Sequence, residues 1–231
     1  MTIGIIGAME EEVANLRESM DVISAKNVIG LDFYLGKLSG RNVVVVRSGI
    51  GKVNAAICTQ VLIDLYAVDC IINVGVAGAL DKSLTIGDIV VSSDAMYHDF
   101  DTSPLGDEPG IISRMDVSSF DADEQLVKLA KETVESLGYP VCVGRVASGD
   151  QFVASPEVKS RIKSLFKPVC CEMEGAAIAH TCHLNKIPFV ILRAISDNAD
   201  DSGDVDYERF FRESALKAAS IIKKMIENID L

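Results

Sequence analysis

The sequence predicts an α/β protein in which helices surround a mostly parallel or mixed β-sheet. Short apolar runs, typical of buried strands, alternate along the chain with longer segments that have helical periodicity. A chain of 231 residues can bury one sizeable core, and no internal repeat or low-complexity linker divides it. We therefore expect residues 1–231 to form a single domain.

The first half of the chain begins with a strand and a helix. Thr2–Ala8 is a short apolar run punctuated by Gly4 and Gly7, which predicts a buried first strand, and an acidic helix follows from Met9 to about Met20. Gly and Asn residues mark a turn between the next two strands. The further elements expected here are strands at Phe33–Leu38, Val43–Ser48 and Cys70–Val74, and an amphipathic helix from Val53 to about Ala67.

The second half opens with a strand at Gly87–Val91, after which residues 98–121 contain Pro104, Pro109 and several Asp and Ser residues. This composition predicts a long loop, and loops of that length inside a compact domain are usually functional or disordered. The later elements expected are helices at Asp123–Leu137, from Pro156, at Gly175–His183 and at Tyr207–Ile229, and strands at Val141–Ala147 and 188–195.

Composition and charge exclude several classes of protein. The net charge is −12, with no run of Lys or Arg, which argues against nucleic acid or an anionic membrane as a partner. No apolar run reaches transmembrane length, and the N-terminus lacks the basic start of a signal peptide. The six cysteines lie in apolar stretches without a C-x-x-C pair, so we expect buried thiols in the reducing cytoplasm and no metal site.

Carboxylates dominate the candidate site. Glu172 and Glu174 lie where an apolar segment meets a nearly all-apolar helix, and acidic groups entering a buried helix are costly unless they are paired or used. The apolar strand that ends at Asp197 also delivers Arg193 and Ser196 at its C-terminal end, which is where α/β folds bind ligands. Together with Glu12, these carboxylates suggest glycosidic cleavage, which uses one carboxyl group as an acid and another to activate water.

The glycine-rich loops do not match the standard phosphate-binding motifs. A Walker A loop ending at Lys52 would need Gly at position 46 and Ser or Thr at 53, where the chain has Val46 and Val53. The dinucleotide fingerprint fails at Asn54. The segment Gly75–Gly78 is either a loop that presents backbone N–H groups to a ligand or a plain tight turn.

Six motifs follow one another over the whole chain, namely Gly4–Glu12, Ser48–Lys52, Gly87–Val91, Ser148–Asp150, Glu172–Glu174 and Arg193–Asp197. In this order they resemble the motifs of the 5′-methylthioadenosine/S-adenosylhomocysteine nucleosidase family. The resemblance implies the three-layer nucleoside phosphorylase-like α/β fold, in which helices surround a central mixed sheet, and a homodimer without a cofactor. It also implies hydrolysis of methylthioadenosine, adenosylhomocysteine and 5′-deoxyadenosine in methionine salvage and S-adenosylmethionine recycling.

By position, the resemblance makes Glu12 the base that activates water and Asp197 the acid that protonates adenine N7. Glu174 would hold the ribose 2′-hydroxyl, with Met173 packed against the sugar. Arg193 and Ser196 would belong to the substrate site. The adenine would contact the backbone of Val153, the ring of Phe152, and Ala77 and Gly78. Met9, Ile50 and Tyr207 would form the 5′-alkylthio pocket. A neighbouring subunit would complete this pocket with residues near Thr102 and Leu105.

The sequence departs from the family pattern at three positions, with Val76 in place of Ser, Tyr207 in place of Phe and Gly175 in place of Ala. Two other functions remain open from the residues. The first is a phosphorylase on the same fold, although Glu12 would repel phosphate. The second is a non-catalytic nucleoside sensor, which would not need both Glu12 and Asp197.

Overall fold

The computed structural model describes residues 1–197 and 207–229, and the side chains of residues 207–210 lie outside that description. Its strands are β1 (Thr2–Gly7), β2 (Asp21–Val28), β3 (Leu31–Leu38), β4 (Arg41–Arg47), β5 (Cys70–Ala79), β6 (Ile89–Tyr97), β7 (Ser119–Asp121), β8 (Val141–Ser148), β9 (Cys170–Glu172) and β10 (Phe189–Asp197). Its helices are α1 (Glu10–Glu18), α2 (Lys52–Tyr66), the short 3₁₀ helix η1 (Ser103–Leu105), α3 (Glu124–Ser136), α4 (Pro156–Phe166), α5 (Gly175–Asn185) and α6 (Tyr207–Asn228).

The described strands join in one mixed sheet, which confirms the predicted fold class. Its order is β10-β6-β8-β9-β5-β1-β4-β3-β2, with β7 attached to β6. β1 runs parallel to β4 and β5, whereas β6 runs antiparallel to β10. Because β10 also pairs with β5, the strands β5, β9, β8, β6 and β10 form a closed ring. This closure brings the ends of β5, β8, β9 and β10 together although they are distant in sequence.

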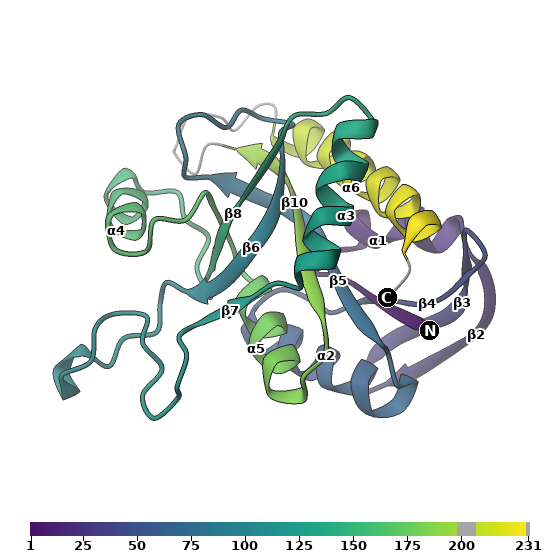
Figure 1. Ribbon diagram of the computed structural model, residues 1–231, viewed down its shortest axis with the longest axis horizontal. Helices are drawn as coiled ribbons and strands as arrows, with labels where there is room; N and C mark the ends of the chain where they lie inside the picture. Colours follow the sequence, from purple (N-terminus) through teal and green to yellow (C-terminus); the bar gives the residue numbers. More distant parts are fainter. Residues whose placement is uncertain (198–206, 230–231) are drawn as a thin grey trace.

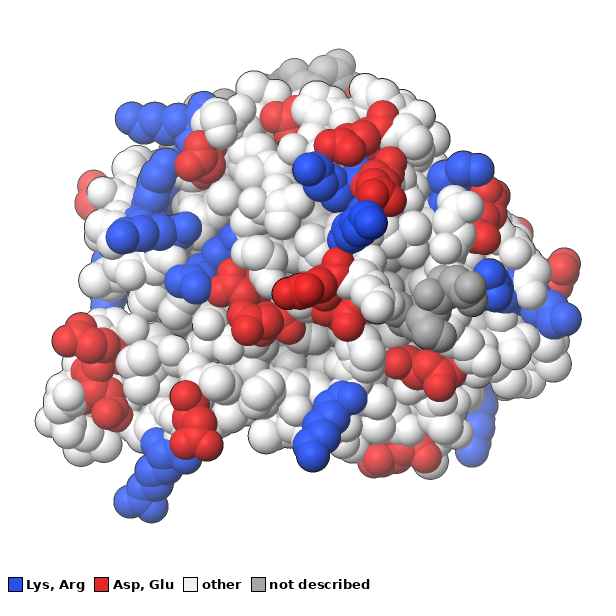
Figure 2. Space-filling view, viewed as in Figure 1, with Lys and Arg blue, Asp and Glu red and all other residues white. Residues whose placement is uncertain are grey.

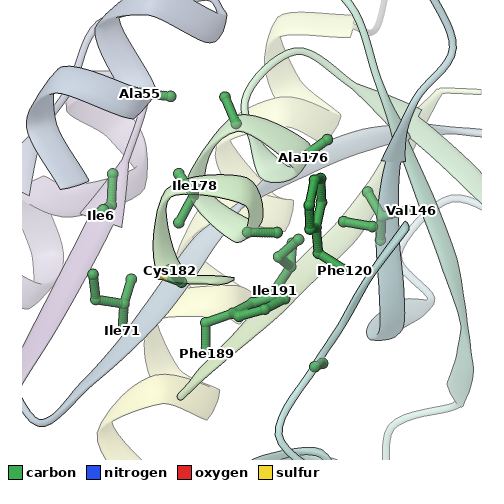
Figure 3. Close-up of a cluster of buried hydrophobic side chains, with 14 of the residues drawn as sticks. Ile6, Ala55, Ile71, Phe120, Val146, Ala176, Ile178, Cys182, Phe189 and Ile191 are labelled. Atoms are coloured by element: carbon green, nitrogen blue, oxygen red, sulfur yellow. The ribbon is translucent and has the colours of Figure 1, made fainter. Parts of the chain in front are cut away.

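Helices cover both faces of the sheet (Figure 1). On one face α2 and α5 pack together, and Ala55, Leu62, Ile178 and Cys182 are fully buried against strand residues such as Ile191 (Figure 3). On the other face α1, α3 and α6 bury a second apolar cluster against the same sheet. Burial of these apolar faces is the main stabilising contribution to the fold.

Several predicted boundaries were wrong. β2 was not predicted, because it is an edge strand exposed along nearly its whole length and lacks the alternation of a half-buried strand. The segment Gly75–Gly78 is neither a loop nor a turn but the continuation of β5 to Ala79. β6 extends to Tyr97, and the expected loop 98–121 contains η1 and β7.

Figure 2 shows acidic and basic side chains scattered over one face, and the Lys and Arg side chains do not form one continuous stripe there. All six cysteines are free thiols, and five are buried, whereas Cys142 is half-buried. No helix among the described residues is long and apolar enough to cross a membrane.

Candidate active site

A pocket opens where β1, β5, β8, β9 and β10 end and where α1, α2 and α5 begin. Most of the residues that the sequence analysis selected line it, although they come from six separate segments of the chain. The lining residues are Ala8, Met9, Glu12, Ile50, Val76, Ala77, Gly78, Gln151, Phe152, Val153, Cys171, Glu172, Met173, Glu174, Ser196 and Asp197.

Glu12 is buried in the first turn of α1 and is held by backbone donors. Its Oε2 accepts hydrogen bonds from the amides of Ala8 (2.6 Å) and Met9 (3.0 Å), and its Oε1 accepts one from the amide of Val76 on β5 (3.2 Å). Burial raises the pKa of Glu12, while the charge of Arg193 and these amides act in the opposite direction. The arrangement orients one carboxylate rigidly and increases its affinity for a proton.

Gly75 explains how β5 can approach this carboxylate so closely. A Cβ atom at position 75 would lie 2.5 Å from Glu12 Oε1 and 3.2 Å from Arg193 Nη1. Because such contacts are shorter than van der Waals distance, only glycine leaves room for both charged groups.

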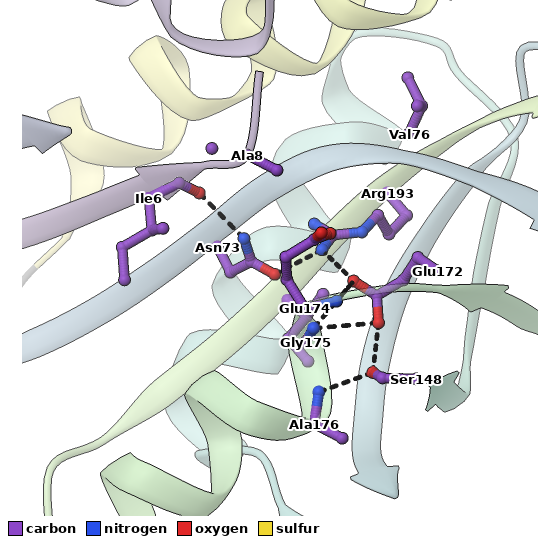
Figure 4. A network of polar contacts seen from close by, with 12 residues as sticks. Ile6, Ala8, Asn73, Val76, Ser148, Glu172, Glu174, Gly175, Ala176 and Arg193 are labelled. Carbon is purple, nitrogen blue, oxygen red and sulfur yellow. Dashed lines mark hydrogen bonds and ion pairs between the residues drawn. The ribbon is translucent and has the colours of Figure 1, made fainter. Parts of the chain in front are cut away.

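Arg193 lies beneath the pocket and not among its lining residues. Its side chain is 2% exposed, and its Nη2 donates to Glu172 Oε2 (2.5 Å) and to Asn73 Oδ1 (2.5 Å). The Asn73 amide in turn donates to the carbonyl of Ile6 (2.9 Å) (Figure 4). Burial alone would lower the pKa of Arg193, but the charges of Glu172 and Glu12 outweigh it and the pKa is raised. Arg193 Nε is buried without a hydrogen-bond partner within the described part of the chain.

Glu172 is the charged partner that keeps Arg193 in place. Its carboxylate accepts hydrogen bonds from Ser148 Oγ and from the amides of Glu174 (3.1 Å) and Gly175 (2.8 Å to Oε2) (Figure 4). Burial acts to raise the pKa of Glu172, but the Arg193 charge and these donors outweigh it, so the pKa lies below its ordinary value. A buried ion pair between Glu172 and Arg193 therefore lies under the site, and the hydrogen bond from the Gly175 amide to Glu172 connects it to the start of α5.

Glu174 faces the pocket from the residue before α5. Its Oε1 accepts a hydrogen bond from the amide of Gly51 (2.8 Å), at the start of α2. Burial, and then the nearby negative charge of Glu172, raise the pKa of Glu174 above its ordinary value. Two carboxylates that are neighbours in sequence thus have opposite pKa shifts, because Glu172 is paired with Arg193 and Glu174 is not.

Asp197 ends β10 on another wall of the pocket. Its position in the sheet is opposite Gly78, after a bulge that follows Ile195. The hydroxyl of Ser196 donates to Asp197 Oδ2 (2.9 Å), which orients the carboxyl group. Asp197 is half-buried and close enough to the pocket to meet a bound molecule.

The remaining lining is mainly apolar. Met9, Ile50, Phe152, Val153 and Met173 surround the carboxylates, and Phe152 is 63% exposed. Tyr207 begins α6, but its side chain lies outside the described residues. Sequence analysis had not selected Ala8, Gln151 and Cys171. Cys171 had been interpreted as a buried thiol only, and burial does raise its pKa to about 12.

This arrangement suits the cleavage of a bond between a sugar and a base. One rigid carboxylate with a neighbouring guanidinium can take a proton from water, and a second carboxyl group on another wall can deliver one. The apolar surfaces can bind flat or alkyl groups and exclude bulk water. Within the described residues, no three His, Cys, Asp or Glu side chains are grouped so that they could hold a metal ion.

Comparisons with known proteins agree on one family. Residues 2–227 match the model of the phosphorylase superfamily. The chain is 42% identical to the 5′-methylthioadenosine/S-adenosylhomocysteine nucleosidase of Staphylococcus haemolyticus, over 97% of this chain and 99% of the relative. The Neisseria meningitidis nucleosidase, solved with methylthio-immucillin-A, superposes with a TM-score of 0.94 at 39% identity, over 99% of each chain. The futalosine hydrolase of Helicobacter pylori also superposes with a TM-score of 0.94, at 35% identity, over 99% of this chain and 98% of that one.

Proposed function

The chain belongs to the phosphorylase superfamily and, within it, to the 5′-methylthioadenosine/S-adenosylhomocysteine nucleosidases, and we propose that the pocket beside Glu12 is its catalytic site. The reaction is hydrolysis of the N-glycosidic bond of methylthioadenosine and adenosylhomocysteine, and we extend it to 5′-deoxyadenosine. The observation that carries the site assignment is the buried Glu12 carboxylate, fixed by three backbone amides in a pocket that also holds Glu174 and Asp197.

Glu12 acts as the general base. Cleavage of an N-ribosidic bond passes through an oxocarbenium-like state, and water must attack the anomeric carbon as the base leaves. Glu12 takes a proton from this water, and its raised proton affinity suits that task. Arg193 Nη1 and Glu12 Oε1 both approach β5 at Gly75, and the charge of Arg193 favours the ionised form of the Glu12 carboxylate.

Asp197 acts as the general acid. Adenine is a poor leaving group as an anion, so its departure requires a proton at N7, and the Asp197 carboxyl group supplies it. Ser196 is a positioning residue, because its hydroxyl fixes one oxygen of Asp197.

The other lining residues bind the three parts of the substrate. Glu174 accepts the ribose 2′-hydroxyl, and Met173 packs on the sugar. The adenine stacks on Phe152 and contacts the backbone of Val153, with Ala77 and Gly78 beside it. The 5′ substituent meets Met9 and Ile50. Support for this division comes from the shared pocket, which is lined both by the carboxylates and by these apolar residues.

Hydrolysis is favoured over phosphorolysis by the charge of the site. Among the described residues that line the pocket none is Lys or Arg, and the buried Arg193 is already paired with Glu172. Phosphate would therefore meet four carboxylates in the pocket lining, and the nearby Arg193 guanidinium is already paired.

Incubation with methylthioadenosine, with and without phosphate, should release adenine and free methylthioribose in equal amounts under both conditions. Product analysis by mass spectrometry checks this. Sugar 1-phosphate would instead identify a phosphorylase, and binding without adenine release would identify a nucleoside sensor. Futalosine belongs in the same panel, because the chain also resembles a futalosine hydrolase.

The protein functions as a homodimer whose subunits complete each other's 5′ pockets. Leu105 is 81% exposed on η1, and its loop is fixed because Asp107 accepts hydrogen bonds from Thr102 (2.9 Å) and Ser113. Val53 on α2 is also exposed. Apolar side chains on an ordered surface are typical of a subunit contact.

Val53→Asp should convert the dimer into a monomer and reduce activity, because a charge in an apolar interface is costly. Sedimentation at assay concentrations checks the mass of both proteins. The matched control is Ile23→Asp, which adds the same charge at an equally exposed position on the edge strand β2. A parent protein that is an active monomer would refute the dimer.

The cytoplasm is the expected compartment. The support is chemical, because all six cysteines are free, and burial raises the pKa of Cys58 and Cys70 to about 12, as expected for inert structural thiols.

A further inference from the structure

The amides of Gly51, the N-cap residue of α2, and of Lys52, its first residue, are bound by carboxylates that belong to other segments. The Gly51 amide donates to Glu174 Oε1 (2.8 Å), and the Lys52 amide donates to Asp150 Oδ1 (2.8 Å). α2 provides no side-chain cap of its own, and its first turn contains no acidic residue. Because the N-terminus of a helix carries unpaired N–H groups and partial positive charge, these carboxylates replace the missing cap.

The side chain of Lys52 closes this arrangement. Its Nζ lies 2.6 Å from Asp99 Oδ2 and 3.8 Å from Asp150 Oδ2. Asp99 Oδ2 also accepts the backbone N–H of Asp150 (2.9 Å). These three residues come from the start of α2, the segment after β6 and the segment after β8. Lys52 and Asp99 are each only 25% exposed, so their attraction is screened less than that of a surface pair.

The backbone around these contacts has little room to move. Gly51 has a φ of 98°, and a Cβ atom there would lie 3.0 Å from Asp150 Oδ1. A Cβ atom at Gly149 would lie 2.4 Å from His98 Cε1. The segment that precedes Phe152 is therefore packed tightly against the end of β6 and the start of α2.

We propose that Lys52, Asp99 and Asp150 form a positioning clamp that fixes the N-terminus of α2 and so orients the Glu174 carboxylate toward the ribose 2′-hydroxyl. None of the three lines the pocket. The proposal rests on the proposed function, since it takes Glu174 as the ribose ligand. The clamp acts through one contact, the hydrogen bond from Gly51 to Glu174.

The chemistry of Glu174 shows why such a clamp is needed. A buried carboxylate beside the charge of Glu172 is costly in its ionised form, and the Gly51 amide offsets part of that cost. If the start of α2 shifts, Glu174 loses this donor and is free to turn away from the sugar.

The test compares a ribonucleoside with its 2′-deoxy counterpart. Lys52→Met and Asp150→Ala should each lower kcat/KM for methylthioadenosine about tenfold, since small misplacements of a catalytic group are costly. The same variants should change kcat/KM for 2′-deoxy-methylthioadenosine little, because that substrate has no hydroxyl for Glu174 to bind. Each variant is compared with the parent protein on the same substrate, so the intrinsic reactivity of the deoxy sugar cancels.

Two controls separate positioning from general stability. Asp150→Asn should retain most of the activity, because asparagine also caps a helix N-terminus. Arg145→Met removes another partly buried ion pair between β6 and β8, in which Arg145 Nη2 lies 2.6 Å from Asp94. It should lower the melting temperature without changing the ratio between the two substrates.

Equal losses on both substrates in folded Lys52→Met and Asp150→Ala, or no loss on either, would overturn the clamp. Glu174→Gln tests the underlying assignment separately. If Glu174→Gln affects both substrates alike, the ribose assignment fails and the clamp loses its purpose. If Glu174→Gln discriminates but the clamp variants do not, only the clamp is wrong.

Discussion

Glu12→Gln should lower kcat by about 10²- to 10⁴-fold while the affinity for a substrate analogue stays nearly unchanged. Glutamine has the same shape as glutamate, and its carbonyl oxygen can still accept hydrogen bonds from the amides of Ala8 and Met9, while only the longer bond from the amide of Val76 is lost. It cannot take a proton from water. Single-turnover kinetics together with calorimetric binding of a methylthioadenosine analogue measure the two effects separately.

Glu11→Gln is the matched control for this change. Glu11 lies next to Glu12 in the first turn of α1, but it is exposed and does not line the pocket. The substitution removes one negative charge from the same helix end and should leave kcat unchanged. Undiminished turnover in Glu12→Gln would show that Glu12 is not the base.

The pH dependence gives a second readout of the same variant. For the parent protein, kcat/KM should rise with pH as Glu12 loses its proton, at a pH above the ordinary range of a glutamate, because burial raises its pKa. The sign for stability is the opposite. A carboxyl group with a raised pKa in the folded state contributes stability below its unfolded pKa, near 4.5, and that contribution is lost as pH rises through the folded pKa. The melting temperature of the parent protein should therefore fall as pH rises through the folded pKa of Glu12. In Glu12→Gln this fall should be smaller, because the contribution of Glu12 is absent.

The carboxylates could be found from the sequence because each follows or precedes a strongly apolar segment. Asp197 ends the apolar strand β10, and Glu174 directly precedes the buried helix α5. The local sequence pattern is sufficient to find such residues. The apolar residues must be buried in a strand or helix, so the polar residue next to them lies at the end of that element. The exposed strand β2 has no such pattern, and its pairing depends on β3 alone.

The partners of these carboxylates could not be found in this way. Arg193 was expected in the substrate site, but it lies beneath it and pairs with Glu172, 21 residues earlier. Lys52, Asp99 and Asp150 follow three different strands, β4, β6 and β8, and meet although they are distant in sequence. Contacts of this kind depend on the assembly of the whole sheet, and no periodicity within one segment encodes them.

Asp197→Asn should lose activity in proportion to how much the leaving group needs a proton. Asparagine keeps the shape of the side chain and can still accept the hydroxyl of Ser196, but it has no carboxylic proton to transfer. General acid catalysis contributes about 10² to 10⁴ in rate, so the loss on methylthioadenosine should be of that size. The activity on a nitrophenyl methylthioriboside should fall much less, because nitrophenolate leaves as an anion without needing a proton.

The comparison with Glu12→Gln makes this test specific. Both substrates need an activated water, so Glu12→Gln should impair both to a similar degree, whereas Asp197→Asn should impair the adenine nucleoside much more than the other substrate. If Asp197 served only to hold the end of β10, its loss would act through stability and reduce both activities equally. Melting temperatures establish that each variant is folded. A folded Asp197→Asn protein that loses the same factor on both leaving groups would show that the proton on adenine comes from another group.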